Sequence, residues 1–177
     1  FRLDPEDPAS GETITWCAAA INALLDHALP AFLEPLMVRR EGARIQVLKD
    51  PASLIRVAGV AAALGRSSLH TWLKLPYGPG YDRVAAATTC PVLMLGGEAA
   101  ADPRPLLTDL AVGLRSGTNV RGALIGRNVL FPGQRDPLAL AAAINALVFN
   151  GLDTEPALAY GERQASLVPA DFWRQLG

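Results

Sequence analysis

Lysine is rare in this chain, and one of its two lysines lies in a stretch whose composition predicts burial. Among 16 basic residues only Lys49 and Lys74 are lysines, so arginine supplies most of the positive charge. Lys74 stands in the middle of TWLKLPY (residues 71–77), an apolar run of strand-forming residues that contains a proline near its end. Burying an ammonium group is costly unless the group is paired or neutralised. Lys74 therefore needs either a partner or a function.

A lysine in such a place can act as a nucleophile. Desolvation lowers the pKa of a lysine, and a neutral amine condenses with carbonyl groups. The stretch is thus typical of a Schiff-base lysine. The alternative is a strand-end lysine that only pairs with a carboxylate, and the stretch by itself supports the two interpretations equally.

Length and composition narrow the class of protein. The 177 residues are enough for one domain with a hydrophobic core, and half of them are hydrophobic. No run of about 18 apolar residues indicates a membrane span. The formal net charge of −1 argues against nucleic acid or an anionic membrane as the main partner. Two cysteines and two histidines form no disulfide framework and no metal-ligand spacing, which indicates a reducing, cytoplasmic location.

The chain alternates between predicted strands and helices, which predicts an α/β fold with a parallel sheet. Strands are predicted at residues 1–4, 31–38, 71–77, 90–97 and 120–127. Helices are predicted at residues 10–28, 50–64, 81–88, 103–115 and 136–149. Three of these helices begin at an Asp-Pro pair, which combines a good N-cap with a proline suited to the first helical position.

Three further segments are predicted to lie outside these elements. Residues 39–49 and 128–133 are predicted to be loops. Residues 150–177 are predicted to be a polar linker followed by a tail helix, in which Phe172, Trp173 and Leu176 could dock.

Polar residues and glycines gather where the predicted strands end. They are Asp4, Glu34, Lys74, Gly96-Gly97 and Gly126-Arg127. In parallel α/β proteins the functional site forms at the carboxyl ends of the strands. Five strand–helix units that all carry polar residues or glycines at the carboxyl ends of their strands favour a (β/α)8 TIM barrel. The glycine motifs typical of nucleotide binding do not occur.

Four segments resemble a known superfamily. They are LEPL around Glu34, WLKLP around Lys74, LGG (residues 95–97) and IGRNVLFP (residues 125–132). Their order and spacing resemble the class I aldolases, TIM barrels that include tagatose-bisphosphate, deoxyribose-phosphate and archaeal-type fructose-bisphosphate aldolases. RLDPEDP, TWLKLP, AATTCPVLMLGGE and RGALIGRNVLFP are most similar to an actinobacterial aldolase-like family associated with inositol catabolism.

The resemblance covers roughly residues 1–148 and implies a part of a barrel. It implies that residues 1–149 form the C-terminal five strand–helix units, strands four to eight, and that residues 150–177 follow as linker and tail. The chain opens without an initiator Met, on residues that already resemble a strand. Since a TIM barrel usually needs about 250 residues, we expect the first three strands to be missing upstream. Such a piece would have to close by homo-oligomerisation or be inactive.

The resemblance also implies roles for individual residues. Lys74 would be the Schiff-base nucleophile and Glu34 the group that transfers protons. The substrate phosphate would be bound by Gly96, Gly97, Gly126 and Arg127. The implied activity is that of a metal-independent lyase without a cofactor, acting on a small phosphorylated carbonyl compound from carbohydrate or inositol breakdown.

Simpler interpretations stay open at this point. Glu34 could be only a structural partner of Lys74, and the Gly96-Gly97 pair could be an ordinary turn. Trp72 shares a strand face with Lys74 and is interpreted as filling the barrel. At the level of the whole protein, the alternatives are a phosphate-binding isomerase barrel, in which Lys74 acts only electrostatically, and a truncated or degenerate barrel without activity.

Overall fold

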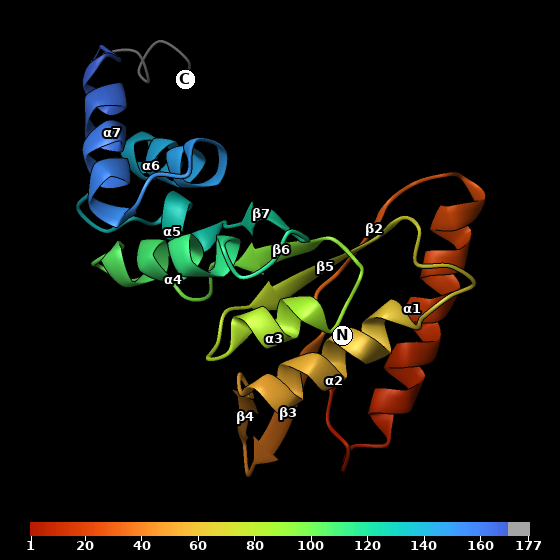
Figure 1. Cartoon of the computed structure of the whole chain (residues 1–177). Coiled ribbons are helices and arrows are strands. Elements are labelled where there is room, and N and C mark those ends of the chain that lie inside the picture. The colour runs from red at the N-terminus through yellow and green to blue at the C-terminus, as the bar shows by residue number, and fades with distance from the viewer. Residues whose placement is uncertain (170–177) are drawn as a thin grey trace. The chain divides into compact units, whose positions relative to one another are not determined.

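The computed structural model describes residues 1–169, which fold as two compact units. The first contains residues 1–95 and 115–124, and the second contains residues 96–114 and the described residues from 125 onward. Figure 1 shows the elements of both units. No helix within residues 1–169 combines the length and the apolar character needed to cross a bilayer.

A four-stranded parallel sheet forms the centre of the first unit. Its strands, in spatial order, are β2 (Ala31–Leu33), β5 (Thr71–Pro76), β6 (Val92–Leu95) and β7 (Val120–Leu124). Each strand pairs in parallel with its neighbour, as the strand–helix alternation predicts. Within residues 1–169 the sheet is open and does not close into a barrel. The parallel α/β fold is therefore confirmed, and the partial barrel stays a prediction.

Helices cover one face of this sheet. Helix α2 (Pro51–Ala62) packs against β5 and against α3 (Tyr81–Ala86). Asp50 caps α2 by accepting a hydrogen bond from the N–H of Ser53 at 3.0 Å, as the Asp-Pro start predicts. The hydrogen bonds from Ser53 hold the pKa of the Asp50 carboxyl below its usual value.

Helix α1 (Ala9–Asp26) joins the same unit through a small hydrophobic cluster. Its Ile21 packs with Ala31 of β2 and with Leu64. Gly65 follows at φ 77°, and a Cβ at this position would lie 2.7 Å from Cγ2 of Ile21. Glycine is therefore required here both by the backbone and by the packing against α1.

The segment predicted as one strand over residues 31–38 is divided at Glu34 and Pro35. The first part, β2, pairs with β5, whereas β3 (Leu36–Glu41) pairs in parallel with β1 (Arg2–Leu3). Proline has no N–H to donate to a strand neighbour, so Pro35 suits a point where a strand changes its partner. The prediction of a single continuous strand is wrong.

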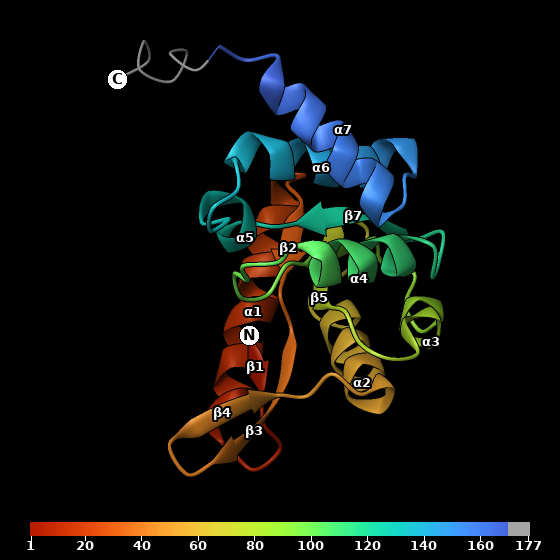
Figure 2. The ribbon, with the colours of Figure 1, turned by 90° about the vertical axis from the view of Figure 1, so that its left-hand side faces the viewer.

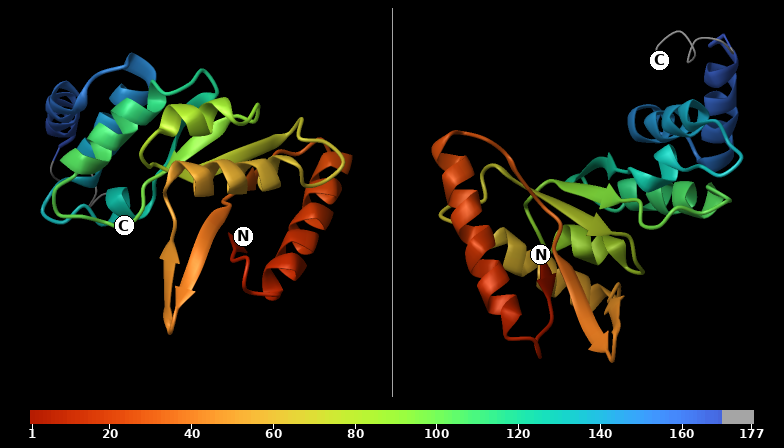
Figure 3. Two further views of the ribbon diagram at one scale, coloured as in Figure 1. Left: turned by 60° about the horizontal axis from the view of Figure 1, so that its bottom comes forward. Right: turned by 180° about the vertical axis from the view of Figure 1, so that it is seen from behind.

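Residues predicted as a polar loop over 39–49 instead form a β-hairpin. Strand β3 pairs in antiparallel fashion with β4 (Arg44–Val47), and Gly42 in the turn has φ 60°. The hairpin is the orange pair of arrows in Figure 3. The side chains nearest the turn are charged and exposed, and this polar stretch explains why a loop was expected.

The second unit is helical. Its helices are α4 (Arg104–Leu114), α5 (Arg127–Leu130), α6 (Pro137–Asn150) and α7 (Thr154–Ser166). Helices α6 and α7 cross in close contact in Figure 2. A Cβ on Gly161 of α7 would lie 2.1 Å from the carbonyl oxygen of Ala139, so only glycine allows this approach.

Two predictions for this unit are corrected by the structure. Residues 154–166 form α7 where a polar linker was expected, and α5 occupies part of the loop expected at 128–133. Helix α7 buries Ala157, Leu158 and Gly161 on one side, a weak apolar pattern within a polar sequence. The predicted docking of Phe172, Trp173 and Leu176 lies outside the described residues, and the domain boundary at residue 149 stays a prediction.

The side chain of Tyr81 is buried, and its hydroxyl has no hydrogen-bond partner among the described residues, which supports a prediction about stability. The residue is 3% exposed. We expect Tyr81→Phe to raise the free energy of unfolding by about 1 kcal/mol, because an unpaired buried polar group is destabilising. Urea denaturation at pH 8 measures the change, and a clear loss of stability would contradict this account.

The same residue predicts a response to alkaline pH. Burial raises the pKa of the Tyr81 hydroxyl above its usual value. The unfolded chain therefore releases this proton at about pH 10, while the folded chain keeps it. Stability should fall as pH rises above about 10, and Tyr81→Phe should remove that part of the decline. Urea denaturation of both proteins between pH 8 and 11 tests this expectation.

Candidate active site

Lys74 and Glu34 meet on the face of the sheet that the helices leave uncovered. Along β5, Leu73 and Leu75 are fully buried, so Lys74 between them points to the opposite side. Leu33 of β2 lies beside Leu73, and Glu34 follows one residue later. The ammonium nitrogen of Lys74 donates a hydrogen bond to Oε2 of Glu34 at 2.6 Å. The structure thus brings together the two residues that the sequence predicts to be catalytic.

The hydrogen-bonded side chains of Lys74 and Glu34 are also accessible to solvent. The side chain of Lys74 is 27% exposed and that of Glu34 is 42% exposed. A carbonyl compound could therefore reach the amine. The hydrogen bond also gives the lysine proton a direct route to a carboxylate, and this is the geometry that general acid–base catalysis requires.

Two turns for which the resemblance to class I aldolases implies phosphate binding lie together in the second unit. One contains Gly96 and Gly97 and follows β6, and the other contains Gly126 and Arg127 and follows β7. The side-chain amide of Asn128 donates to the carbonyl of Gly96 at 2.8 Å. Asn128 itself is only 4% exposed. This buried amide holds the two turns at a fixed spacing.

The geometry of these turns suits an anion. Gly97 has φ 67°, a conformation that favours glycine. Gly126 has φ −110°, so the backbone does not require glycine there, and a Cβ added to it would meet no atom within 4 Å. The guanidinium of Arg127 is exposed and takes part in no ion pair within residues 1–169. Open backbone beside an exposed guanidinium is an arrangement that can hold a phosphate group.

Asn128 was missed in the analysis of the sequence. It follows Arg127 directly, but its partner Gly96 lies 32 residues away, so no local pattern reveals the contact.

Gly96 and Gly126 are expected to respond differently to substitution by alanine. A Cβ on Gly96 would lie 2.7 Å from Cγ2 of Ile125 and 3.2 Å from the amide nitrogen of Asn128. We expect Gly96→Ala to lower the free energy of unfolding by about 1–3 kcal/mol through overpacking. Gly126→Ala is the matched control and should change it by less than about 0.5 kcal/mol. Urea denaturation compares the two, and equal losses would contradict the described contact.

Metal binding has no obvious place in the described structure. Within residues 1–169, no three side chains of His, Cys, Asp or Glu lie close enough together to hold a metal ion.

Comparison with known proteins shows the family to which most of the chain belongs. Residues 1–147 match the Cgl0159-like family. The crystal structure of Cgl0159 from Corynebacterium glutamicum is 30% identical and has a TM-score of 0.79, with 85% of this chain and 50% of that chain covered. Among curated proteins, none matches this sequence.

Two fructose-bisphosphate aldolases share the fold at lower identity. The enzyme from Slackia heliotrinireducens is 18% identical with a TM-score of 0.68, covering 97% of this chain and 54% of that one. An archaeal fructose 1,6-bisphosphate aldolase is 22% identical and has a TM-score of 0.65, with 84% of this chain and 56% of that chain covered. The chain thus spans about half the length of these structures.

Proposed function

The chain belongs to the Cgl0159-like family, and from this premise we propose that it is a class I, Schiff-base aldolase acting on a phosphorylated carbonyl compound. The observation that carries the proposal is the hydrogen bond of 2.6 Å between Lys74 and Glu34 on the uncovered face of the sheet. The structural likeness to fructose-bisphosphate aldolases supports the same reaction class.

The first half of the reaction attaches the substrate. Glu34 takes a proton from the ammonium group of Lys74, and the freed amine adds to the carbonyl carbon of the substrate. The nitrogen of Lys74 gives one of its protons to the carbonyl oxygen, which becomes the hydroxyl of a neutral carbinolamine. Glu34 then returns its proton to this hydroxyl, which leaves as water, and a carbon–nitrogen double bond forms at Lys74 as a cationic iminium.

The second half breaks the carbon–carbon bond. Glu34, again a carboxylate, accepts the proton of the hydroxyl on the β carbon, and that carbon becomes the carbonyl carbon of the first product. The electron pair of the broken bond moves into the iminium and gives a neutral enamine. Glu34 returns this proton to the enamine carbon, which restores the iminium. Addition of water then releases the second product and regenerates the ammonium group of Lys74 beside the carboxylate of Glu34.

The glycine turns would bind the phosphate of the substrate. Gly96 and Gly97 would present backbone N–H groups, Gly126 would leave room for close approach, and Arg127 would supply the positive charge. Asn128 would keep the two turns at the spacing that this contact needs. We place the substrate in carbohydrate or inositol breakdown, where phosphorylated ketoses arise.

Cleavage in the presence of a chelator and a reductant tests the proposal. The chain is incubated with a ketose bisphosphate, and the two carbonyl products are quantified. EDTA should leave the rate unchanged, and borohydride should inactivate the protein only when substrate is present, because it reduces the iminium. Turnover that resists borohydride would favour an isomerase or a metal-dependent lyase, and absence of turnover would favour a barrel without activity.

A further inference from the structure

Asp4, a polar residue at a strand end that the proposed function does not use, lines a cavity in the first unit. The cavity has a volume of about 310 Å³, which lies near the lower end of the range for ligand pockets. Its walls come from the connection between β1 and α1, from the β3–β4 hairpin and from α2. Neither Lys74 nor Glu34 lines it, so the cavity is separate from the candidate active site.

The buried part of the cavity wall is apolar. Met37 and Val38 of β3 are 3% and 5% exposed, and Leu48 is half-buried. The N–H of Leu48 donates a hydrogen bond to the carbonyl oxygen of Met37 at 2.9 Å, which fixes the base of the hairpin. A molecule that enters the cavity therefore gains from placing apolar carbon against this wall.

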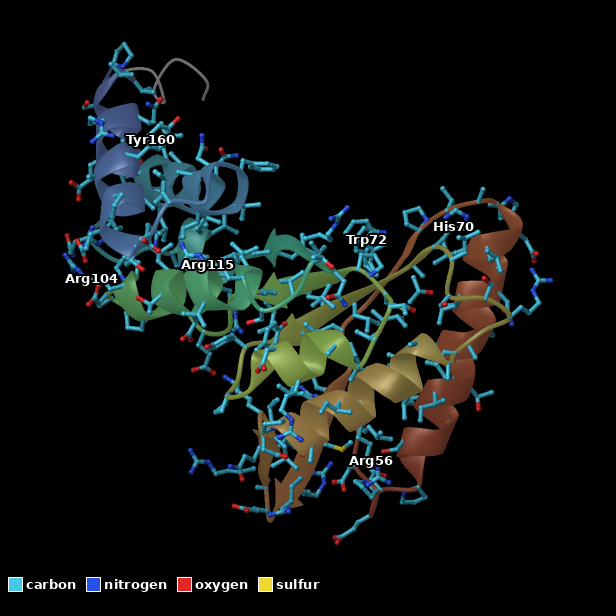
Figure 4. All side chains as sticks on the ribbon, viewed as in Figure 1. Arg56, His70, Trp72, Arg104, Arg115 and Tyr160 are labelled. Atoms are coloured by element: carbon cyan, nitrogen blue, oxygen red, sulfur yellow. The ribbon has the colours of Figure 1, made fainter. Side chains whose placement is uncertain are left out.

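Two arginines reach the cavity from different elements. Arg39 lies two residues after Met37, so the two side chains share a face of β3, whereas Arg56 belongs to α2. In the view of Figure 4, Arg56 extends from α2 toward the side on which the hairpin lies. Neither guanidinium has an ion-pair or hydrogen-bond partner within residues 1–169. Two such groups at one small cavity are suited to binding a carboxylate.

Two carboxylates complete the wall. Asp4 and Glu6 follow β1, and Oδ1 of Asp4 accepts a hydrogen bond from the N–H of Glu6 at 3.1 Å. In the described structure, no oxygen of either carboxylate lies within 4.0 Å of a guanidinium nitrogen of Arg39 or Arg56. The positive and negative side chains around the cavity are therefore equal in number but not paired with one another. Their remaining acceptor positions can receive hydrogen bonds from an ammonium group.

We propose that this cavity binds a zwitterionic α-amino acid with an aliphatic side chain. The two arginines bind its carboxylate, the carboxylates of Asp4 and Glu6 bind its ammonium group, and the apolar wall contacts its side chain. A simple anion such as phosphate does not match this wall, because the two carboxylates repel it. The proposal does not depend on the proposed aldolase function, since no residue of the candidate active site takes part.

Binding of L-leucine to the full chain tests the proposal. Its dissociation constant is measured by saturation-transfer NMR and is compared with those of two analogues. The analogues are 4-methylpentanoate, which lacks the ammonium group, and 3-methylbutylamine, which lacks the carboxylate. Each should bind at least about tenfold more weakly than L-leucine, because each leaves one pair of charged side chains without a partner. Equal affinity for all three molecules would overturn the proposal.

Two substitutions test the two ends of the ligand separately. Arg56→Gln should weaken the binding of L-leucine and of 4-methylpentanoate about tenfold and leave that of 3-methylbutylamine unchanged. Glu6→Gln should weaken the binding of L-leucine and of 3-methylbutylamine and leave that of 4-methylpentanoate unchanged. Both side chains are exposed, so the variants should fold, which circular dichroism checks. A uniform loss for all three molecules in the folded variants would overturn the proposed contacts.

Arg40→Gln is the matched control. Arg40 is the next residue after Arg39 in β3, is also exposed, and lines a neighbouring cavity instead of this one. This variant should change the affinity for L-leucine less than twofold. An effect as large as that of Arg56→Gln would place the ligand elsewhere and overturn the proposal, as would unchanged binding in both Arg56→Gln and Glu6→Gln.

Discussion

Replacing Lys74 by arginine is expected to abolish the reaction, with a loss of turnover of roughly 10⁴- to 10⁶-fold, as for other nucleophiles that form covalent intermediates. Arginine keeps a positive charge opposite Glu34, so the fold should persist. Its guanidinium stays protonated and cannot form an iminium with a carbonyl compound. Turnover assays and circular dichroism on the purified variant check both parts of this expectation.

Lys49 provides the matched control for this variant. It is the second lysine of the chain and is exposed. Lys49→Arg should therefore retain full activity. A similar loss in the two variants, or substantial activity in Lys74→Arg, would remove Lys74 from its proposed function as the nucleophile.

The second large effect is expected at Glu34. Glutamine has nearly the same shape and can still accept a hydrogen bond from Lys74, but it cannot take up or return a proton. We expect Glu34→Gln to lower kcat by about 10²- to 10⁴-fold, the usual contribution of general acid–base catalysis. The KM for a phosphorylated substrate should change little, since the proposed phosphate contacts do not involve Glu34.

The control and the conservative variant make this prediction specific. Glu41 is an exposed glutamate in β3, and Glu41→Gln should leave kcat unchanged. Glu34→Asp keeps a carboxylate and should recover part of the activity that Glu34→Gln loses. A purely structural pairing of Glu34 with Lys74 would instead reduce stability in Glu34→Gln without a selective effect on kcat.

Local signals explain which parts of the fold were predictable from the sequence. Strand β5 is a short apolar run that includes a proline, and α2 and α6 both begin at Asp-Pro pairs, so their positions follow from neighbouring residues alone. The change of partner at Pro35 is different. Residues 31–38 form a continuous apolar run with one acidic residue, and which strand each half pairs with is decided by tertiary contacts.

The remaining errors have the same physical origin. Around the turn of the β3–β4 hairpin the residues are charged and exposed, and this polar stretch predicts a loop, although β4 alternates polar and apolar residues over its four positions. Helix α7 packs on α6 through Gly161 and a few small residues, which produces a weak pattern in a polar sequence. Both elements are specified by contacts with partners that local sequence cannot reveal.

For the candidate site, the sequence predicts individual residues but not the contacts between them. Lys74 is unusual because lysine is rare in this chain and because it interrupts an apolar strand, and Glu34 by its position at the end of a predicted strand. Their contact at 2.6 Å depends on the register between β2 and β5, which the sequence does not disclose. The same holds for Asn128 and for the pairing of Phe32 with Trp72, because each joins residues more than 30 positions apart.

The most direct test of the central claim is to locate the covalent adduct. The chain is incubated with a ketose phosphate, reduced with borohydride, digested and analysed by mass spectrometry. The account predicts a mass increase on the peptide that contains Lys74 and none on the peptide that contains Lys49. Equal labelling of both lysines, or labelling of Lys49 alone, would contradict an aldolase that works through Lys74.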